Sequence, residues 1–413
     1  MFKIRWLDFN QFLVILVTMI TLVSCAENPK DMMGKAKHDT LNIDNILQRA
    51  VHQLELQKEE AKKNQRIPRT IGKDGEIHWA KLEFDWTEGF FPGSLWYMYK
   101  TTNDIKWRMD AEKFQAMFES HKYFTDNHDL GFIFNTSFAN GYEFTKNDNY
   151  KEVLITAADA LVTRFNPKVG CIKSWDTDKG WQSKRNWKYP VIIDNMMNLE
   201  LLFKVSELTK NPKYKEIAIT HANTTLKNHF RDDYSSYHVV DYDPLTGEVR
   251  SKQTAQGFAN ESAWARGQAW GVYGYTVCYR YTKDPKYLEQ ANKIAEFILK
   301  KNASNNDNLP FWDYNASNIP NELVDVSAAA ISTAALLELD GYTNVSYKTY
   351  IDHLIMVLSS EKYTNKQGEN HNFILKHSVG SIPHGNEIDV PLSYADYYYI
   401  EALIRYKQKY SEG

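Results

Sequence analysis

The feature that most constrains the fold of this chain is a series of long apolar segments with helical periodicity, beside which alternating strand-like patterns are scarce. Over residues 42–63, apolar side chains recur mostly at the spacing of one helical face. Further segments of this kind cover residues 153–161, 196–203, 269–279, 287–299, 328–339 and 394–406. Such periodicity indicates helices, whereas a half-buried strand alternates every second residue. The sequence therefore predicts an all-α protein.

Landmark residues of the chain follow one another at intervals of about 60 to 70 residues, which is room for two helices and their loops. They are Asp129, Asp194, Arg266, Ser327 and Asp396. Six helical hairpins at this interval predict a twelve-helix (α/α)6 barrel, with small and aromatic residues on the inner helices. A long α-solenoid is the alternative, but the units share little sequence with each other. No linker rich in Pro, Gly or Ser interrupts the chain, so we expect one domain over residues 40–413.

Short Lys-Asn-Pro and Lys-Asp-Pro runs mark two of the expected boundaries between helices. They occupy residues 210–212 and 283–285, and each is followed two residues later by a Tyr. Proline is favoured at the first position of a helix, because the N–H group that it lacks has no partner there. Both runs therefore predict the start of a new helix.

The first 25 residues have the pattern of a lipoprotein signal peptide. Lys3 and Arg5 give a basic start, and the apolar stretch over residues 12–23 is too short to span a bilayer comfortably. A Leu-Val-Ser-Cys run ending at Cys25 resembles a lipobox. We expect export, lipidation at Cys25, a polar tether over residues 26–39, and anchoring to the bacterial cell membrane, facing the periplasm or the cell surface. An ordinary signal peptide is the alternative.

Charge and cysteine content exclude several classes of function. The formal net charge is -3, so no global field attracts nucleic acid, and the membrane is expected to be a partner only through the lipid. Cys171 and Cys278 are far apart and outside any Cys/His cluster, which predicts two buried free thiols and no metal site. The chain carries 11 Trp, 26 Tyr and 20 Phe, many beside Gly, Asp or His. Most of these fill a core, but aromatic faces also stack on sugar rings.

One carboxylate, Asp194, lies inside a strongly apolar run over residues 189–199. A buried carboxylate is costly unless it is paired, protonated or functional. Burial also raises its pKa, which is what a general acid at neutral pH requires. The sequence therefore indicates an acid at Asp194, with a helix cap as the alternative.

Two other motifs contain candidate site residues. His128 and Asp129 precede a glycine-bearing segment, where loops at helix ends often carry reactive groups, although most such aspartates cap helices. Arg266 and Trp270 are four residues apart, so they share one helix face. A guanidinium beside an indole is a suitable receptor for a sugar carboxylate. A buried structural arginine stacked on tryptophan is the equally weighted alternative.

Six runs together resemble one known family. They are GFFPGSLW, NHDLGF, VIIDNMMNLELLF, SAWARGQAWGVYG, DVSAAAI and YADYYYIEALIR. In this order, and over nearly the whole mature chain, they are similar to the unsaturated glucuronyl hydrolases of glycoside hydrolase family 88. The resemblance implies an (α/α)6 catalytic domain that uses no metal or organic cofactor. It also implies removal of the terminal 4,5-unsaturated glucuronic acid from oligosaccharides that polysaccharide lyases produce.

In that family an aspartate protonates C4 of the unsaturated ring while water adds at C5, and the resulting hemiketal rearranges to expel the rest of the chain. By resemblance, Asp194 is the general acid and base, and Asp129 is the second essential carboxylate. The resemblance assigns substrate contacts to the following side chains, of which His238 and Thr254 rest on loop spacing alone: His128, Trp175, His238, Thr254, Gln256, Arg266 and Trp270.

The resemblance leaves the polysaccharide open, with ulvan or a glycosaminoglycan as the expected source. Some relatives that accept sulfated sugars carry a Ser-x-x-Ser-x-Lys run, but Pro383 stands where that lysine would be, followed by His384. One alternative is an unsaturated galacturonyl hydrolase acting on pectin fragments. Another is a non-catalytic, lipid-anchored protein that binds glycans at the cell surface. Nothing in the sequence indicates an oligomeric state.

Overall fold

The computed structural model describes residues 41–410, and a compact unit begins at Asn42. The expected signal peptide, the lipidation site Cys25 and the tether lie outside the described residues, as do residues 411–413.

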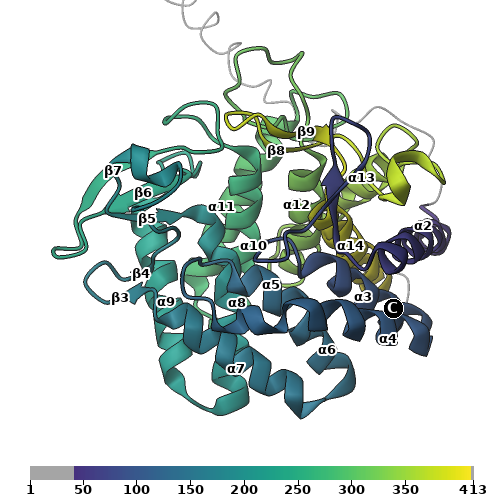
Figure 1. Cartoon of the computed structure of the whole chain (residues 1–413). Coiled ribbons are helices and arrows are strands. Elements are labelled where there is room, and N and C mark those ends of the chain that lie inside the picture. Colours follow the sequence, from purple (N-terminus) through teal and green to yellow (C-terminus); the bar gives the residue numbers. More distant parts are fainter. Residues whose placement is uncertain (1–40, 411–413) are drawn as a thin grey trace, which may run out of the picture. The chain divides into compact units, whose positions relative to one another are not determined.

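The compact unit consists of alternating outer and inner helices (Figure 1). The outer helices are α2 (Ile43–Asn64), α4 (Ile105–Gln115), α7 (Asp148–Val162), α9 (Pro212–Asn228), α11 (Pro285–Asn302) and α13 (Lys348–Leu358). The inner helices are α3 (Phe90–Thr102), α5 (Leu130–Thr136) with α6 (Phe138–Thr145), α8 (Leu199–Thr209), α10 (Ala265–Thr282), α12 (Val326–Leu339) and α14 (Ser393–Tyr410). Each inner helix packs on the next, and α14 closes the ring against α3. This is the predicted (α/α)6 barrel.

The start of each helix follows from local sequence. Asn211 and Asp284 cap α9 and α11, each accepting a bond from the backbone N–H two residues later, with Pro at the first helical position as predicted. Asp325 caps α12 through the backbone N–H of Ser327. Because outer helices alternate with inner ones, all six inner helices begin at the same end of the barrel, and the landmark residues lie at or near those starts.

Short antiparallel strands and 3-10 helices lie in the segments that connect the helices of the barrel. The strands are β1 (Pro68–Ile71), β2 (Ile77–Trp79), β3 (Phe165–Asn166), β4 (Cys171–Ile172), β5 (Tyr189–Ile192), β6 (Val239–Tyr242), β7 (Val249–Gln253), β8 (Ser378–Ser381) and β9 (Asn386–Val390). The 3-10 helices are η1 (Ala116–Tyr123), η2 (Gln182–Arg185), η3 (Ile193–Asn198) and η4 (Glu369–Asn372). In the largest sheet, β5 pairs with β6, and Ile192 lies opposite Val239. These strands have two to five residues, too few for a clear alternating pattern.

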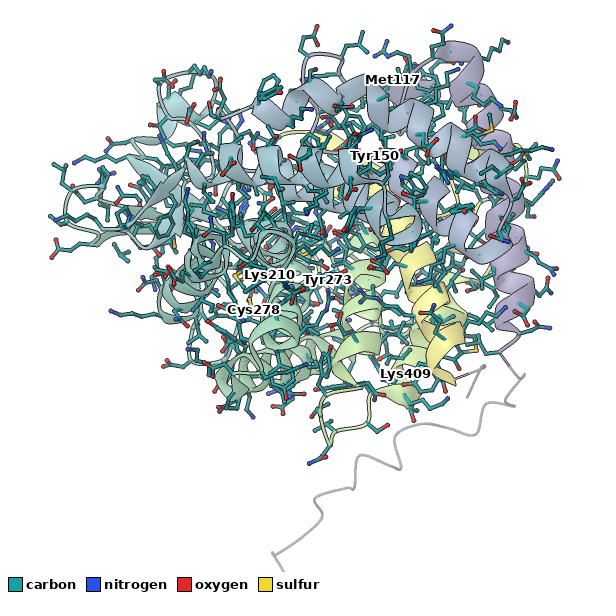
Figure 2. The ribbon with its side chains drawn as sticks, turned by 90° about the horizontal axis from the view of Figure 1, so that it is seen from below. Met117, Tyr150, Lys210, Tyr273, Cys278 and Lys409 are labelled. Atoms are coloured by element: carbon teal, nitrogen blue, oxygen red, sulfur yellow. The ribbon has the colours of Figure 1, made fainter. Side chains whose placement is uncertain are left out.

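The end of the barrel where the inner helices finish is closed by ion pairs. Arg280 binds both carboxylate oxygens of Glu338 at 2.6 Å and Glu200 at 2.6 Å, and Arg405 donates to Glu401 at 3.0 Å. Cations there complement the negative ends of the helix dipoles. A cavity of about 490 Å³ lies among these residues, and two of its lining residues, Tyr273 and Lys409, are labelled in Figure 2. It contains none of the predicted site residues.

The two remaining cysteines, Cys171 and Cys278, are buried free thiols, as predicted. Within residues 41–410, no cluster of three or more His, Cys, Asp or Glu side chains is arranged to hold a metal ion.

Candidate active site

Asp129 and Asp194 lie at the starts of neighbouring inner helices. Asp129 is the N-cap residue of α5 but makes no side-chain cap bond, and Asp194 lies in the first turn of η3, directly before α8. Each is only 8% exposed. Since neither carboxyl caps its own helix, the capping alternative raised from the sequence does not account for either residue.

Both carboxyls are held partly protonated by their surroundings. Burial raises the pKa of Asp194 from 3.8 to about 7, although the charge of Arg266 opposes the shift. Burial, and next the nearby charge of Asp194, raise the pKa of Asp129 to about 8. A carboxyl that titrates near neutral pH can both give and take a proton under working conditions.

Two fully buried histidines flank the aspartates. His128 Nε2 lies 3.3 Å from Asp129 Oδ1, and His238 Nε2 lies 3.7 Å from Asp194 Oδ2. Burial lowers the pKa of His128 to about 3 and that of His238 well below its usual value, so both rings are neutral at physiological pH.

Several buried polar atoms of Asp194, the two histidines and residues on α10 and α14 have no hydrogen-bond partner. They are His128 Nε2, Asp194 Oδ2, His238 Nε2, Trp270 Nε1 and Tyr394 Oη. Buried polar groups are nearly always satisfied, and a group of orphaned ones marks where a polar ligand binds. The orphaned atoms therefore mark a candidate site for a polar ligand near the starts of the inner helices.

Tryptophan rings pack beside the two histidines of this candidate site. Trp175 packs edge-on against His128 at 6.4 Å and against His238 at 6.1 Å between ring centroids. Trp181 and Trp187 pack on Trp175 at 5.1 and 5.8 Å. The position of Trp175 between the two histidines fits the stacking role that the sequence resemblance implies.

Arg266 is committed to protein contacts. Its guanidinium donates to Asp325 Oδ2 at 3.1 Å, to the carbonyl of Gly380 at 2.6 Å and to the carbonyl of Val379. It lies over the ring of Trp264 at 4.5 Å, rather than pairing with Trp270. These contacts favour the structural alternative raised from the sequence, and a direct substrate contact of Arg266 stays a prediction.

The other predicted contact residues lie beside His238 or Asp194. Thr254 and Gln256 lie on the loop beside His238, where the backbone N–H of Gln256 donates to the His238 ring at 3.1 Å. The side chain of Gln256 reaches the carbonyl of Gly380 at 3.4 Å. Trp270 is buried, and its N–H stabilises the carboxylate form of Asp194 without making a full hydrogen bond.

Two asparagines that were not predicted from the sequence, Asn195 and Asn198, link η3 to His128 and to α5 through hydrogen bonds. Asn195 accepts at Oδ1 from the Asn198 amide at 3.0 Å and lies 3.0 Å from His128 Nδ1. Asn198 also accepts from the backbone N–H of Gly131 at 2.8 Å, which joins η3 to α5. Both are fully buried, and their polarity inside the apolar run over residues 189–199 was the available signal.

Comparisons with known proteins agree on one family. A family model described as Glycosyl Hydrolase Family 88 matches residues 57–409. An unsaturated glucuronyl hydrolase of Formosa agariphila is 45% identical over 343 residues, covering 82% of this chain and 84% of that protein. An unsaturated chondroitin disaccharide hydrolase of Streptococcus agalactiae is 31% identical over 393 residues, covering 93% and 96%.

Solved structures agree with the sequence relatives. The crystal structure of an unsaturated glucuronyl hydrolase specific for heparin matches with a TM-score of 0.83 at 44% identity, covering 88% of this chain and 98% of that chain. That of an unsaturated glucuronyl hydrolase from Bacillus sp. GL1 matches with a TM-score of 0.80 at 27% identity, covering 88% and 97%. The matched regions include both aspartates and nearly the whole barrel, which confirms the resemblance inferred from the motifs. The chain therefore belongs to glycosyl hydrolase family 88.

Proposed function

We propose that this protein removes the terminal 4,5-unsaturated glucuronic acid from lyase-generated oligosaccharides, with Asp194 as the general acid and base. The observation that carries the proposal is a buried Asp194 whose pKa lies near 7, with one oxygen that has no partner, beside a second buried carboxyl. Family membership and its hydrolase relatives favour an enzyme over the non-catalytic glycan-binding alternative.

The chemistry begins at the enol ether of the unsaturated ring. Asp194 gives its proton to C4, so positive charge develops at C5 and the ring oxygen, and water adds at C5 as Asp194 takes back a proton. The resulting hemiketal opens to a C5 ketone and leaves a hemiacetal at C1, which collapses to release the remaining saccharide. A carboxyl with a pKa near 7 suits both halves of this exchange. The C–O bond to the second sugar needs no direct protonation at the start, unlike ordinary glycoside hydrolysis.

The position of the candidate site suits an anionic substrate. Six inner helices begin at this end, and their N-termini carry partial positive charge. The uronate carboxylate is therefore attracted to the end of the barrel that holds Asp129 and Asp194.

The test is the Asp194→Asn variant, assayed by the loss of ultraviolet absorbance as the conjugated double bond disappears. We expect turnover to fall by at least about 100-fold while substrate still binds, because the amide keeps the shape but gives no proton. Asp396→Asn is the matched control, since burial raises the pKa of Asp396 to about 7 as well, yet its two oxygens accept the backbone N–H groups of Ile374 and Leu375 and contact none of the predicted site residues. Activity above a hundredth of wild type in Asp194→Asn would remove the general-acid assignment.

The source polysaccharide is proposed to be ulvan or a glycosaminoglycan. The relatives include an unsaturated chondroitin disaccharide hydrolase and a glucuronyl hydrolase specific for heparin, and both support a glycosaminoglycan as the source. Lyase-generated disaccharides from ulvan, chondroitin, heparin, alginate and pectin separate the possibilities by their rates. Activity restricted to pectin fragments would instead establish the galacturonyl alternative.

We further propose that Cys25 is lipidated and anchors the exported enzyme to the membrane. The support is the lipobox-like run before Cys25. Over residues 41–410, no helix is sufficiently long and apolar to cross a bilayer. Metabolic labelling with palmitate tests the anchor: the label should appear in the wild type and be absent from Cys25→Ser, and an unlabelled, exported wild type would mean an ordinary signal peptide.

A further inference from the structure

The two buried histidines beside the aspartates have different hydrogen-bond partners. We propose that His128 and His238 are positioning residues with opposite tautomers, which favour the acid form of Asp129 and stabilise the carboxylate that Asp194 forms after it gives its proton. The proposal rests on the proposed function, because it takes these two carboxyls to be the catalytic pair.

The tautomer of His238 follows from the loop beside it. The backbone N–H groups of Ala255 and Gln256 both point at His238 Nδ1, each at 3.1 Å. A backbone N–H can only donate, so Nδ1 must be the unprotonated, accepting nitrogen of the neutral ring. The ring proton is therefore on Nε2, which faces Asp194 Oδ2 at 3.7 Å. Neither atom has another hydrogen-bond partner, and such contacts tighten when substrate binds.

The tautomer of His128 follows from two amides whose orientation is fixed. Asn195 directs its NH2 group to the carbonyl of Ile172 at 2.7 Å, so its Oδ1 is the atom that lies 3.0 Å from His128 Nδ1. Asn198 accepts from the Gly131 N–H, so its NH2 group donates to the same Asn195 Oδ1.

A lone pair on His128 Nδ1 would face the lone pairs of Asn195 Oδ1, whereas an N–H there makes a hydrogen bond. Protonation of Nδ1 therefore satisfies the network, and it leaves an unprotonated Nε2 facing Asp129 Oδ1 at 3.3 Å. The Asn198 NH2 group carries two N–H bonds and also lies 3.1 Å from Nδ1. An unprotonated Nδ1 would accept from it but would leave its lone pair against Asn195 Oδ1, whereas a protonated Nδ1 and the Asn198 amide both donate to that oxygen.

The two rings act on the carboxyls in opposite senses. An unprotonated nitrogen facing Asp129 favours the acid form, which can donate to it, and an N–H facing Asp194 favours the carboxylate, which can accept from it. These contacts act beside burial, which is the main cause that raises the pKa of both Asp129 and Asp194. The other charged or titratable groups that act on these four residues are Asp85, Arg164, Arg185, His221, His229, Arg266 and His384.

This arrangement gives each carboxyl one task. Asp194 alternates between acid and carboxylate, and the His238 N–H stabilises the carboxylate that forms when C4 is protonated. Asp129 stays neutral throughout, so it repels neither that carboxylate nor the uronate of the substrate.

Two substitutions separate the two contacts of His238. In His238→Asn, the amide oxygen lies near the Nδ1 position and keeps the bonds from the 255–256 backbone, but the donor to Asp194 is lost. In His238→Gln, the amide nitrogen lies near the Nε2 position and keeps that donor. We expect the basic limb of the kcat–pH profile to move up by about one unit in His238→Asn, because the carboxylate of Asp194 loses a stabilising donor. His238→Gln should keep the limb within a few tenths of a unit.

The tautomers themselves are measurable without turnover. Imidazole 15N–1H correlation spectra of the full-length protein at pH 7 distinguish the two neutral forms, and the signals are assigned by their absence in His128→Gln and His238→Gln. We expect Nδ1–H for His128 and Nε2–H for His238. An Nδ1–H tautomer at His238 would overturn the proposal. So would a His238→Asn variant whose kcat falls while the pKa values of its kcat–pH profile stay unchanged. If the wild type hydrolyses no unsaturated glucuronide, the proposed function fails, and the spectra still decide the tautomers.

Discussion

The contacts of Arg266 predict a large loss of stability when its side chain is removed. Arg266 is 1% exposed and Asp325 0%, so Arg266→Ala leaves a buried carboxylate without its counter-charge. Removing one member of a buried ion pair costs about 3–5 kcal/mol, and the carbonyls of Val379 and Gly380 lose donors as well. Asp325 keeps bonds from Ser327 and from the Val379 N–H, which limits the total. We expect the free energy of unfolding of Arg266→Ala to fall by about 4 kcal/mol.

Urea unfolding followed by tryptophan fluorescence measures this loss through the shift in midpoint. A double-mutant cycle with Asp325→Asn isolates the pair, and we expect the double variant to be less destabilised than the sum of the single ones by at least about 2 kcal/mol. The reasoning is refuted if the free energy of unfolding of Arg266→Ala falls by less than about 1 kcal/mol while its KM rises at least about tenfold. That result would make the guanidinium a receptor for the substrate carboxylate, which is the other role considered from the sequence.

Two further predictions concern packing and pH. A Cβ at Gly274 would lie 2.5 Å from Met196 Cβ on η3, so Gly274→Ala should cost about 1–3 kcal/mol of stability and lower kcat by displacing the Asp194 turn. In the control Gly271→Ala, the nearest neighbour of the new Cβ is a side-chain atom at 3.4 Å, so that variant should be neutral or stabilised by up to about 1 kcal/mol. Equal melting temperatures and rates for the two variants would contradict this. Burial raises the pKa of Asp396 from 3.8 to about 7, so between these pH values the folded protein holds a proton that the unfolded chain has released. Relative to Asp396→Asn, the wild type should therefore lose about 1.4 kcal/mol of stability per pH unit as the pH rises through this window, and parallel stability curves for the two proteins would disprove the assignment.

The sequence predicted the helical architecture because its signals are local. Apolar periodicity and the two proline-containing turns identified segments that form α2, α7, α8, α9, α10, α11, α12 and α14 in the structure, whereas α13 was not identified. The burial of Asp194 and its raised pKa also followed from a single apolar run.

Features that depend on distant contacts were not predictable from such signals. The partner of Arg266 is Asp325, on another inner helix, and helical spacing suggested Trp270 instead. The tautomers of His128 and His238 depend on amides and loop N–H groups brought together by the fold. A single sequence contains no spacing rule for such contacts, since each joins separate elements.

The pairing of β5 with β6 bears on how this enzyme can diversify. Asp194 follows β5 closely, His238 immediately precedes β6, and the Ile193 N–H donates to the His238 carbonyl at 3.0 Å, so strand register aligns the acid with its histidine. The turn that joins β6 to β7 lies at the opposite end of β6, where Leu245 is 79% exposed. Asn166 donates to the Pro244 carbonyl at 3.0 Å, so the part of this turn that tolerates insertion is its exposed tip at Leu245 and Thr246, far from the end of β6 that carries His238. The exposed turn is thus open to evolutionary drift or to engineered fusion, while the pairing of β5 with β6 keeps the proton donor fixed.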